Sequence, residues 1–214
     1  MFVDRADAGR RLAKRLAGRT YSQGLVVSIP RGGVVVGAEI ARALRLPQDI
    51  ITPRKIGAPY NPELAVGAVT QDGAAIFNEN LAEQFGLTPR KKENAIAEAV
   101  AEINRRMELY RGNRPPVSWG GREIILTDDG IATGYTAIAA LRSLRKAGPR
   151  EIILAVPVAP PDTLETLRPE VDEIICLLVP EVFMAVGQFY YHFDQTSDEE
   201  VIHLLNETSS GPVQ

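Results

Sequence analysis

The chain of 214 residues has a single cysteine, no long hydrophobic run and a net charge of only −3. Cys176 has no second cysteine to pair with, which excludes an intrachain disulfide, and we expect it to be a small apolar core side chain. No apolar stretch is long enough to span a membrane and no signal-peptide pattern is found at the start, so we expect a cytoplasmic protein without a membrane partner. The small net charge gives no general basic field, which argues against a nucleic-acid partner.

Two common phosphate-binding motifs are also missing. The chain has no Gly-Lys-Ser/Thr phosphate loop, and the spacing of its glycines at 32–37 does not match a dinucleotide fingerprint. Apolar runs instead alternate with helical patterns along the whole chain. Strands are expected at 25–29, 49–54, 124–126, 151–156 and 173–179, and helices at 4–17, 34–44, 89–111, 137–147 and 162–167. This alternation predicts an α/β fold with a doubly wound, mainly parallel sheet of about five strands and flanking helices.

Two adjacent carboxylates follow an apolar run in the second half of the chain. Residues 124–126 predict a strand buried on both faces, and Asp128 and Asp129 stand at its carboxyl end, where open α/β sheets place their ligands. Neighbouring ionised carboxylates repel each other, so the pair implies vicinal hydroxyls or a hydrated divalent cation as its partner. Residues 133–136 then lead into a predicted helix whose free N–H groups suit a phosphate monoester. The two sites together match the span of a ribose 5-phosphate.

A second strand also turns into a helix through a polar loop. The predicted strand at 25–29 is followed by Pro30, Arg31, Gly32 and Gly33. The glycines let backbone amides approach an anion closely, and Arg31 adds a fixed positive charge. These four residues would also fit an ordinary turn, but their place before the acidic motif favours a second anion site.

The order of apolar strand, acidic pair, Thr-Gly and a second hydroxyl residue resembles the signature of the type I phosphoribosyltransferases. Those enzymes use 5-phosphoribosyl 1-pyrophosphate (PRPP). The resemblance implies that Asp128 and Asp129 hold the ribose 2- and 3-hydroxyls and that the loop at 30–33 grips the pyrophosphate. It implies that one loop wraps the 5-phosphate, namely Gly130, Ile131, Ala132, Thr133, Gly134, Tyr135 and Thr136.

The resemblance also implies an activity and its partners. The expected reaction transfers the phosphoribosyl group of PRPP to a nucleobase-like acceptor and releases pyrophosphate, as part of nucleotide metabolism. Mg²⁺ is the expected cofactor; it would arrive on PRPP and lie near Asp128 and Asp129. The expected partners are PRPP and a small-molecule acceptor, with a homodimer left open.

Family members carry a basic residue at the end of a core strand, followed by a mobile flap. Arg54 and Lys55 end the predicted strand at 49–54, and we expect them beside the pyrophosphate, with Lys55 counted as catalytic together with the acidic pair. A solvated charge pair at a strand end is the alternative. Residues 57–77 are the expected flap, because they begin with a Gly- and Pro-rich stretch and a hairpin is predicted around Gln71-Asp72-Gly73.

An aromatic-rich segment follows the last predicted strand. Phe183, Tyr190 and Tyr191 are the candidate acceptor-binding residues, since a flat base can stack on such rings. The alternative is that these rings cover the sheet edge as core. The segment resembles the hood of a loosely defined group of bacterial phosphoribosyltransferase-like proteins whose acceptor is generally unassigned. We therefore expect one domain over 1–214, with its core at about 20–180, the flap at about 57–80, the hood at about 180–207, and a frayed tail from 209.

Two positions depart from well-known relatives. Hypoxanthine-guanine enzymes carry an acidic residue where this chain has Ala132, which argues against a 6-oxopurine acceptor. Tyr135 stands where many relatives have a small residue, and we expect it to crowd the phosphate loop.

Three other interpretations stay open. The Asp-Asp-Gly sequence could be only a surface turn, with Thr133 as a helix cap. A non-catalytic PRPP-binding regulator would keep the same fold, although no added DNA-binding segment or basic face is visible. A metal or phosphoacceptor site is disfavoured, because receiver domains need acidic residues where Pro30 and Arg31 stand, and haloacid-type phosphatases need Asp-x-Asp.

Overall fold

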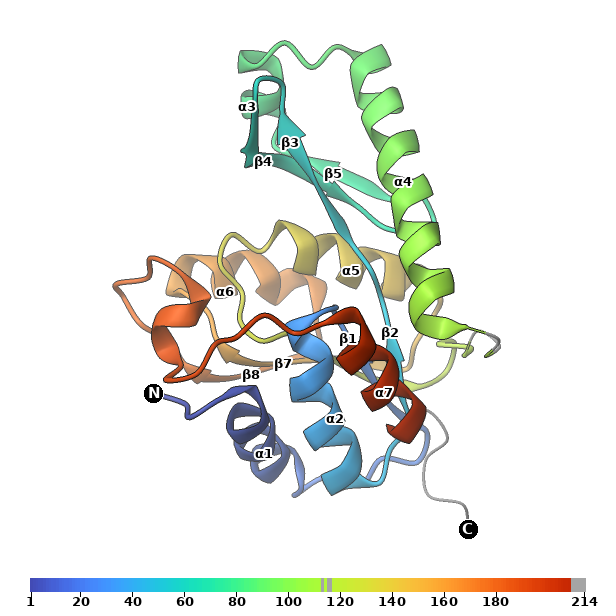
Figure 1. The fold of residues 1–214 in the computed structure, drawn as a ribbon, viewed down its shortest axis with the longest axis vertical. Coiled ribbons are helices and arrows are strands. Elements are labelled where there is room, and N and C mark those ends of the chain that lie inside the picture. The colour runs from blue at the N-terminus through green and yellow to red at the C-terminus, as the bar shows by residue number, and fades with distance from the viewer. Residues whose placement is uncertain (113, 115–116, 209–214) are drawn as a thin grey trace.

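A five-stranded parallel sheet forms the centre of the computed structural model, which describes residues 1–112, 114 and 117–208 (Figure 1). The strand order is β2-β1-β6-β7-β8, and all four neighbouring pairs are parallel. The strands are β1 (Gly24–Ser28), β2 (Gln48–Ile50), β6 (Glu123–Thr127), β7 (Glu151–Val158) and β8 (Glu173–Leu178). The predicted α/β class and the number of core strands are therefore confirmed.

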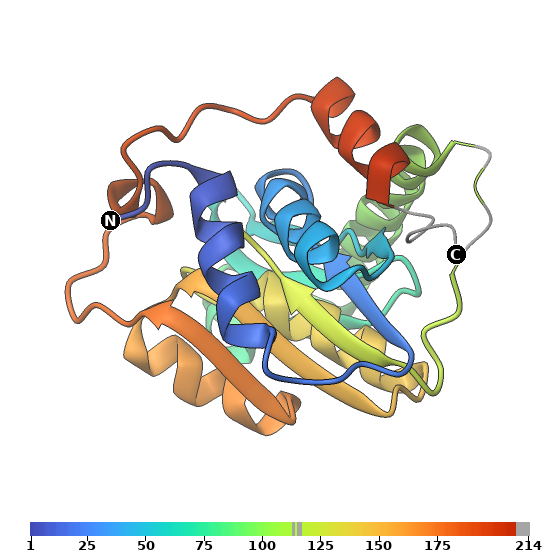
Figure 2. The ribbon, with the colours of Figure 1, turned by 90° about the horizontal axis from the view of Figure 1, so that it is seen from below.

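Helices cover both faces of this sheet, as Figure 2 shows. One face carries α1 (Arg5–Leu16) and α2 (Gly32–Leu44), which pack on Val26 and Ile125. The other face carries α5 (Tyr135–Lys146) and α6 (Pro161–Leu167), which pack on the alternate residues of the same strands. Every residue of β1 and β6 is buried, which explains why these runs are continuously apolar rather than alternating.

The predicted helix starts at Asp4 and Thr88 are confirmed by their capping bonds. The Asp4 side chain accepts a hydrogen bond from the Asp7 N–H at 2.7 Å, and Thr88 caps α4 (Pro89–Arg111), whose first residue is proline. The inner face of α4 packs under the flap and α7 (Asp198–Thr208). Its buried residues are Ala99, Ile103, Met107 and Tyr110.

A second, antiparallel sheet forms the flap, which projects from the core together with α4 (Figure 1). Its strands are β3 (Arg54–Ala58), β4 (Asn61–Val69) and β5 (Ala75–Phe77), followed by α3 (Glu79–Gln84). The predicted hairpin is confirmed: the Thr70 N–H donates to the Ala74 carbonyl, and Gly73 adopts a φ of 74° at the turn.

The predicted strand at 49–54 was wrong in its extent. The core strand β2 ends at Ile50, and Arg54 instead opens the first strand of the flap. Pro53 explains the break, because proline has no N–H to donate to a ladder. The basic pair therefore belongs to the flap and not to the core sheet.

After β8 the chain forms the hood, which contains the 3₁₀ turn η2 (Val186–Phe189), and then enters α7. A further 3₁₀ turn, η1 (Arg168–Glu170), follows α6. The hood lies beside the start of the chain, where Phe2 and Tyr190 form a bridge. Among the helices that the structure describes, none is long and apolar enough to cross a membrane. The predicted frayed tail from 209 lies outside the described residues.

Candidate functional site

The acidic pair and the loop at 30–33 lie side by side at the carboxyl edge of the sheet. The reason is topological: β1 and β6 are parallel neighbours with Ser28 opposite Thr127, so the loops that follow them leave the sheet together. A Cβ built on Gly32 would overlap the Asp129 Oδ2 atom, so a larger residue here would require the Asp129 side chain to move. The peptide bond between Pro30 and Arg31 is cis.

The two carboxyl groups have different surroundings. Burial, together with the neighbouring charge of Asp129, raises the pKa of Asp128 well above its usual range. Asp128 also accepts a hydrogen bond from the Asp129 N–H at 2.8 Å. The Asp129 carboxylate instead accepts a hydrogen bond from the Arg5 Nε atom at 2.7 Å. Asp129 is therefore held next to a cation, whereas Asp128 lies where desolvation disfavours its charge.

The loop from 130 to 136 forms an open cradle at the start of α5. Gly134 precedes the helix with a φ of 78° and makes no side-chain cap, and the first N–H groups of a helix have no partner within it. The Ile131 N–H bonds to the Val158 carbonyl on β7 at 2.9 Å, which fixes the loop to the sheet. The Ala132 carbonyl accepts a hydrogen bond from Thr163 at 2.7 Å. The fixed backbone and the helix dipole suit a phosphate.

The glycines and the threonines of this loop differ in exposure, and Gly130 and Gly134 are buried. A Cβ on Gly130 would meet Val186 of the hood at 2.5 Å, so the loop and the hood are in close contact. Thr133 is exposed and Thr136 is half-buried. Their hydroxyl groups are therefore accessible to a ligand in the cradle.

Arg31 begins α2 beside the acidic pair. Its Nη1 atom lies 3.8 Å from Asp198 Oδ1 at the start of α7. Asp198 in turn accepts a hydrogen bond from the Tyr110 hydroxyl at 2.6 Å. Burial and this contact with Asp198 raise the pKa of Tyr110 to about 12, so the phenol stays a donor at neutral pH. Arg31, which we predicted to bind pyrophosphate, is therefore half-exposed and has Asp198 as its counter-ion.

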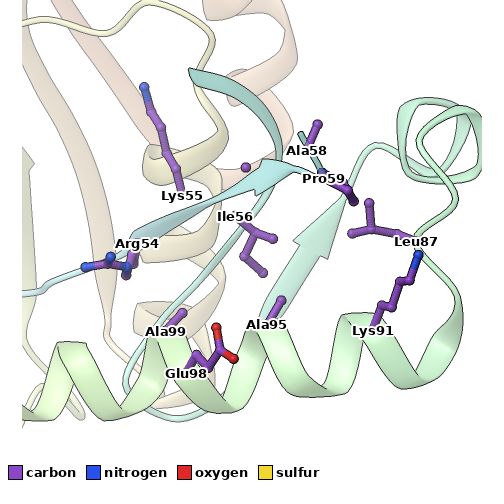
Figure 3. A pocket seen from close by; sticks show the side chains of 11 residues that line it. Arg54, Lys55, Ile56, Ala58, Pro59, Leu87, Lys91, Ala95, Glu98 and Ala99 are labelled. Carbon is purple, nitrogen blue, oxygen red and sulfur yellow. The ribbon is translucent and has the colours of Figure 1, made fainter. Parts of the chain in front are cut away.

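Arg54 and Lys55 are both exposed and occupy different places. Arg54 lines a small cavity of about 30 Å³ together with Pro30, and its Nη1 atom lies 3.5 Å from Glu102. Lys55 extends from the face of β3 opposite to Ile56 (Figure 3). The structure therefore brings Arg54 close to the loop at 30–33, whereas Lys55 is not among the residues that line this cavity.

A larger cavity of about 380 Å³ lies between β3 and α4. Figure 3 shows Ile56, Leu87 and Ala99 around it, with Lys91 and Glu98 at its rim. Arg54 and Lys55 also line this cavity, whereas Asp128, Asp129 and the loop at 130–136 do not.

The three candidate acceptor residues of the hood differ in exposure. Tyr190 is buried, with its ring centroid 5.2 Å from that of Phe2 and 5.0 Å from that of Phe193. Its hydroxyl donates to the Asp129 carbonyl at 2.5 Å. Tyr190 therefore takes the alternative role of a core ring, and it supports the acidic pair. Phe183 is half-buried, with its ring centroid 5.3 Å from that of Phe189, and Tyr191 is 69% exposed.

Comparison with known proteins identifies the family of the chain. Residues 3–194 match the phosphoribosyl transferase domain. The chain belongs to this family. Two Mycobacterium tuberculosis proteins, of strains CDC 1551 / Oshkosh and ATCC 25618 / H37Rv, are provisionally named phosphoribosyl transferases and are 41% identical over 206 residues. The match covers 96% of this chain but 46% of each relative, so the chain spans about half the length of these curated relatives.

Solved structures show the same fold. A Thermus thermophilus protein known from its crystal structure is 38% identical, with a TM-score of 0.82 over 98% of this chain and 99% of its own. A hypothetical protein of Neisseria gonorrhoeae with bound ppGpp is 11% identical, with a TM-score of 0.50 over 95% of this chain and 92% of its own. The second likeness concerns the fold alone.

Three residues around the phosphoribosyl transferase motif were missed by sequence reasoning. Arg5 contacts the acidic pair, Asp198 faces Arg31, and Tyr110 holds Asp198. Arg5 carried no signal, because it is one of several arginines on the predicted helix at 4–17. Tyr110 lies in the predicted helix at 89–111, where an aromatic residue indicates only a buried helix face. Contacts of this kind depend on the tertiary arrangement and leave no local pattern.

Proposed function

We propose that this phosphoribosyl transferase domain binds PRPP across the carboxyl edge of the sheet and transfers its phosphoribosyl group to a nucleobase-like acceptor, releasing pyrophosphate. One observation carries the proposal: Gly32 of the loop after β1 packs directly against the Asp129 carboxylate. The site for the ribose and the site for the pyrophosphate are therefore continuous. The cradle at 130–136 begins immediately after the acidic pair and supplies the proposed site for the 5-phosphate.

Each part has a role in the proposed reaction. Asp128 and Asp129 bind the ribose 2- and 3-hydroxyls, and the cradle binds the 5-phosphate. When the bond between the anomeric carbon and pyrophosphate breaks, pyrophosphate leaves with the electron pair and the ribose ring gains oxocarbenium-like charge. Arg31 and Arg54 stabilise the leaving anion, and the carboxylates favour the positive ring. The acceptor nitrogen then bonds to the anomeric carbon and loses its proton.

The carboxylates at this edge suit a magnesium ion that arrives with the substrate. Among the described residues, no group of three or more His, Cys, Asp or Glu side chains could hold a metal ion. Mg²⁺ commonly binds through one or two carboxylates together with substrate phosphates, and Asp128 and Asp129 provide such a set. The ion would supply charge neutralisation on the pyrophosphate.

The hood and the phosphate loop bear on the acceptor. Ala132 is exposed where hypoxanthine-guanine enzymes carry an acid, so a 6-oxopurine would find no carboxylate there. Phe183 and Tyr191 offer ring faces for a flat base. The flap excludes water from the site during the transfer.

Two measurements test the proposal. Calorimetry with PRPP and Mg²⁺ should show binding, and a pyrophosphate-release assay against a panel of nucleobases should show turnover with at least one of them. Binding without release for any base would leave the non-catalytic regulator as the better account. Absence of PRPP binding would contradict both the transferase and the regulator.

The variant Arg31→Ala distinguishes binding of the pyrophosphate end of PRPP from binding of the ribose 5-phosphate end. We expect this variant to weaken PRPP and pyrophosphate at least tenfold, about 1.4 kcal/mol, because it removes a charge-assisted contact, while ribose 5-phosphate binding stays unchanged. Arg150→Ala is the matched control, since Arg150 precedes β7 at the opposite edge of the sheet and is 68% exposed. Equal losses for PRPP and ribose 5-phosphate would contradict the pyrophosphate role of Arg31.

A further inference from the structure

We propose that Arg5 is a positioning residue of the PRPP site, which holds the Asp129 carboxylate in the orientation that binds the ribose hydroxyls. This inference rests on the proposed function of Asp129. It assigns a role in the site to the first residue of α1, which lies 124 positions away from Asp129 in the sequence.

The contact between the two residues is short and largely shielded from solvent. The Arg5 Nε atom lies 2.7 Å from Asp129 Oδ2, and the two side chains are only 12% and 16% exposed. A hydrogen bond between charged groups at this distance is among the strong ones in proteins, and low exposure weakens screening by salt. The pair therefore limits how the Asp129 side chain can rotate.

Arg5 is itself fixed from two further directions. Its Nη1 atom donates to the Asp194 carbonyl at 2.6 Å, and its guanidinium carbon lies 3.8 Å from the centre of the Phe193 ring. The planar guanidinium can make these contacts at once, which a lysine ammonium cannot do equally well. Arg5 thus ties the start of α1, the hood and the acidic pair together.

The arrangement leaves Asp129 able to bind a ligand. A carboxylate offers about four acceptor positions, and Arg5 occupies one of them. The main chain of Asp129 is also anchored, because its carbonyl accepts the Tyr190 hydroxyl. Without the cation, repulsion from Asp128 would favour rotation of the Asp129 side chain out of the site. Arg5 also offsets part of the negative charge that the highly anionic PRPP meets on entry.

A double-mutant cycle on the full chain tests this role. Calorimetry in the presence of Mg²⁺ compares wild type, Arg5→Gln, Asp129→Asn and the double variant, with PRPP, ribose 5-phosphate and pyrophosphate as separate ligands. We expect Arg5→Gln to weaken PRPP and ribose 5-phosphate equally, by about tenfold, and to leave pyrophosphate unchanged. In the Asp129→Asn background, Arg5→Gln should have no further effect. Arg5→Lys should restore part of the affinity, since it keeps the charge.

Two further variants separate positioning from general stability. Arg10→Gln removes an exposed arginine from the same helix and should leave all three affinities unchanged. Phe193→Leu removes the ring under the guanidinium without altering any charge, and it should give a smaller loss with the same ligand pattern. It also provides the test if Arg5→Gln does not fold.

The outcomes are distinguishable. Loss of pyrophosphate affinity in Arg5→Gln would show direct contact with the leaving group and would overturn the positioning role. Additive losses in the double variant would overturn it as well. If wild type binds PRPP and Arg5→Gln binds it equally well, only this inference falls. If wild type does not bind PRPP, the proposed function and this inference fall together.

Discussion

Asp128 and Asp129 are neighbours in sequence with opposite electrostatic surroundings. Desolvation and a neighbouring like charge raise the pKa of the half-buried Asp128, whereas Asp129 faces the cation Arg5. A buried carboxyl group beside another one disfavours the ionised form, and removal of its charge relieves that cost. Removal of the Asp129 charge instead leaves Arg5 without its partner. Two chemically identical substitutions should therefore act on stability in opposite directions.

At pH 7 we expect Asp128→Asn to raise the melting temperature by several degrees and Asp129→Asn to lower it. The raised pKa of Asp128 means that its folded form prefers the proton. The wild type therefore loses stability as pH rises through that pKa and recovers it below the unfolded value of about 3.9. The advantage of Asp128→Asn should accordingly be largest at neutral pH and disappear in acid. Thermal unfolding measured across pH checks this.

Each variant serves as the control for the other, because both keep the side-chain shape. Both should bind PRPP more weakly than wild type. Equal changes in melting temperature for the two variants, or a stabilisation by Asp128→Asn that persists in acid, would contradict the assigned environments.

At the scale of elements, the start of α7 lies against the loop that opens α2. Asp198 faces Arg31 at 3.8 Å and is held there by Tyr110 from α4. The same cation is the expected contact for pyrophosphate, so the carboxylate and the ligand compete for it. Partly exposed ion pairs of this kind contribute at most about 1 kcal/mol.

Asp198→Asn should therefore strengthen pyrophosphate binding by about two- to fivefold, since the negative charge disappears while the amide oxygen still accepts from Tyr110. Glu199→Gln removes the adjacent exposed acid and should have no effect. Calorimetry with pyrophosphate and with ribose 5-phosphate as separate ligands checks this, and only the affinity for pyrophosphate should change. A weaker affinity for pyrophosphate in Asp198→Asn would show that Asp198 supports the ligand rather than competing with it.

A second link between elements joins the flap to the phosphate cradle. The Asn78 side chain caps α3 and donates to the Tyr135 hydroxyl at 2.9 Å. Tyr135, which the sequence predicted to crowd the loop, is half-buried and makes this bond at the first residue of α5. The bond fixes the end of β5 relative to the cradle.

Tyr135→Phe should loosen this junction, because it removes one hydrogen bond worth about 1 kcal/mol. We expect the amide of Leu81, which bonds to Asn78, to exchange about fivefold faster. Tyr60→Phe is the control, since Tyr60 stands in the exposed turn of the flap. Unchanged exchange at Leu81 would mean that the flap is held without Tyr135.

At the scale of the whole molecule, the sheet protects the lone cysteine. Cys176 lies on β8 opposite Val156, and burial raises the pKa of its thiol to about 11. At pH 8 roughly one thiol in a thousand is then ionised, and only the thiolate reacts with alkylating reagents.

Iodoacetamide should therefore leave the native protein almost unlabelled at pH 8 and modify Cys176 only as urea unfolds the chain. Mass spectrometry along a urea series measures this. Saturating PRPP should move the labelling midpoint to higher urea, because the ligand stabilises the folded state. Native labelling at the rate of free cysteine would contradict the raised pKa of this half-buried thiol.

Much of the fold could be predicted because its signals are local. The buried strands before Asp128 and Pro30 are continuous apolar runs, and the capping residues Asp4 and Thr88 mark helix starts. The error at 49–54 arose where Pro53 interrupts an otherwise strand-like run. Proline lacks the N–H that a strand ladder needs, so Pro53 is the sequence signal for this break.

The candidate site likewise has features that local sequence predicts and contacts that it does not. The sequence alone determined the acidic pair, the glycines beside it and the cradle at 130–136, since each follows a predicted strand within a few residues. Only the tertiary structure decided that Arg5 pairs with Asp129, that Asp198 faces Arg31 and that Tyr190 is a core ring. The physical reason is distance along the chain. Periodicity and turn chemistry act over a few residues, whereas these contacts exist only after the sheet has brought remote segments together.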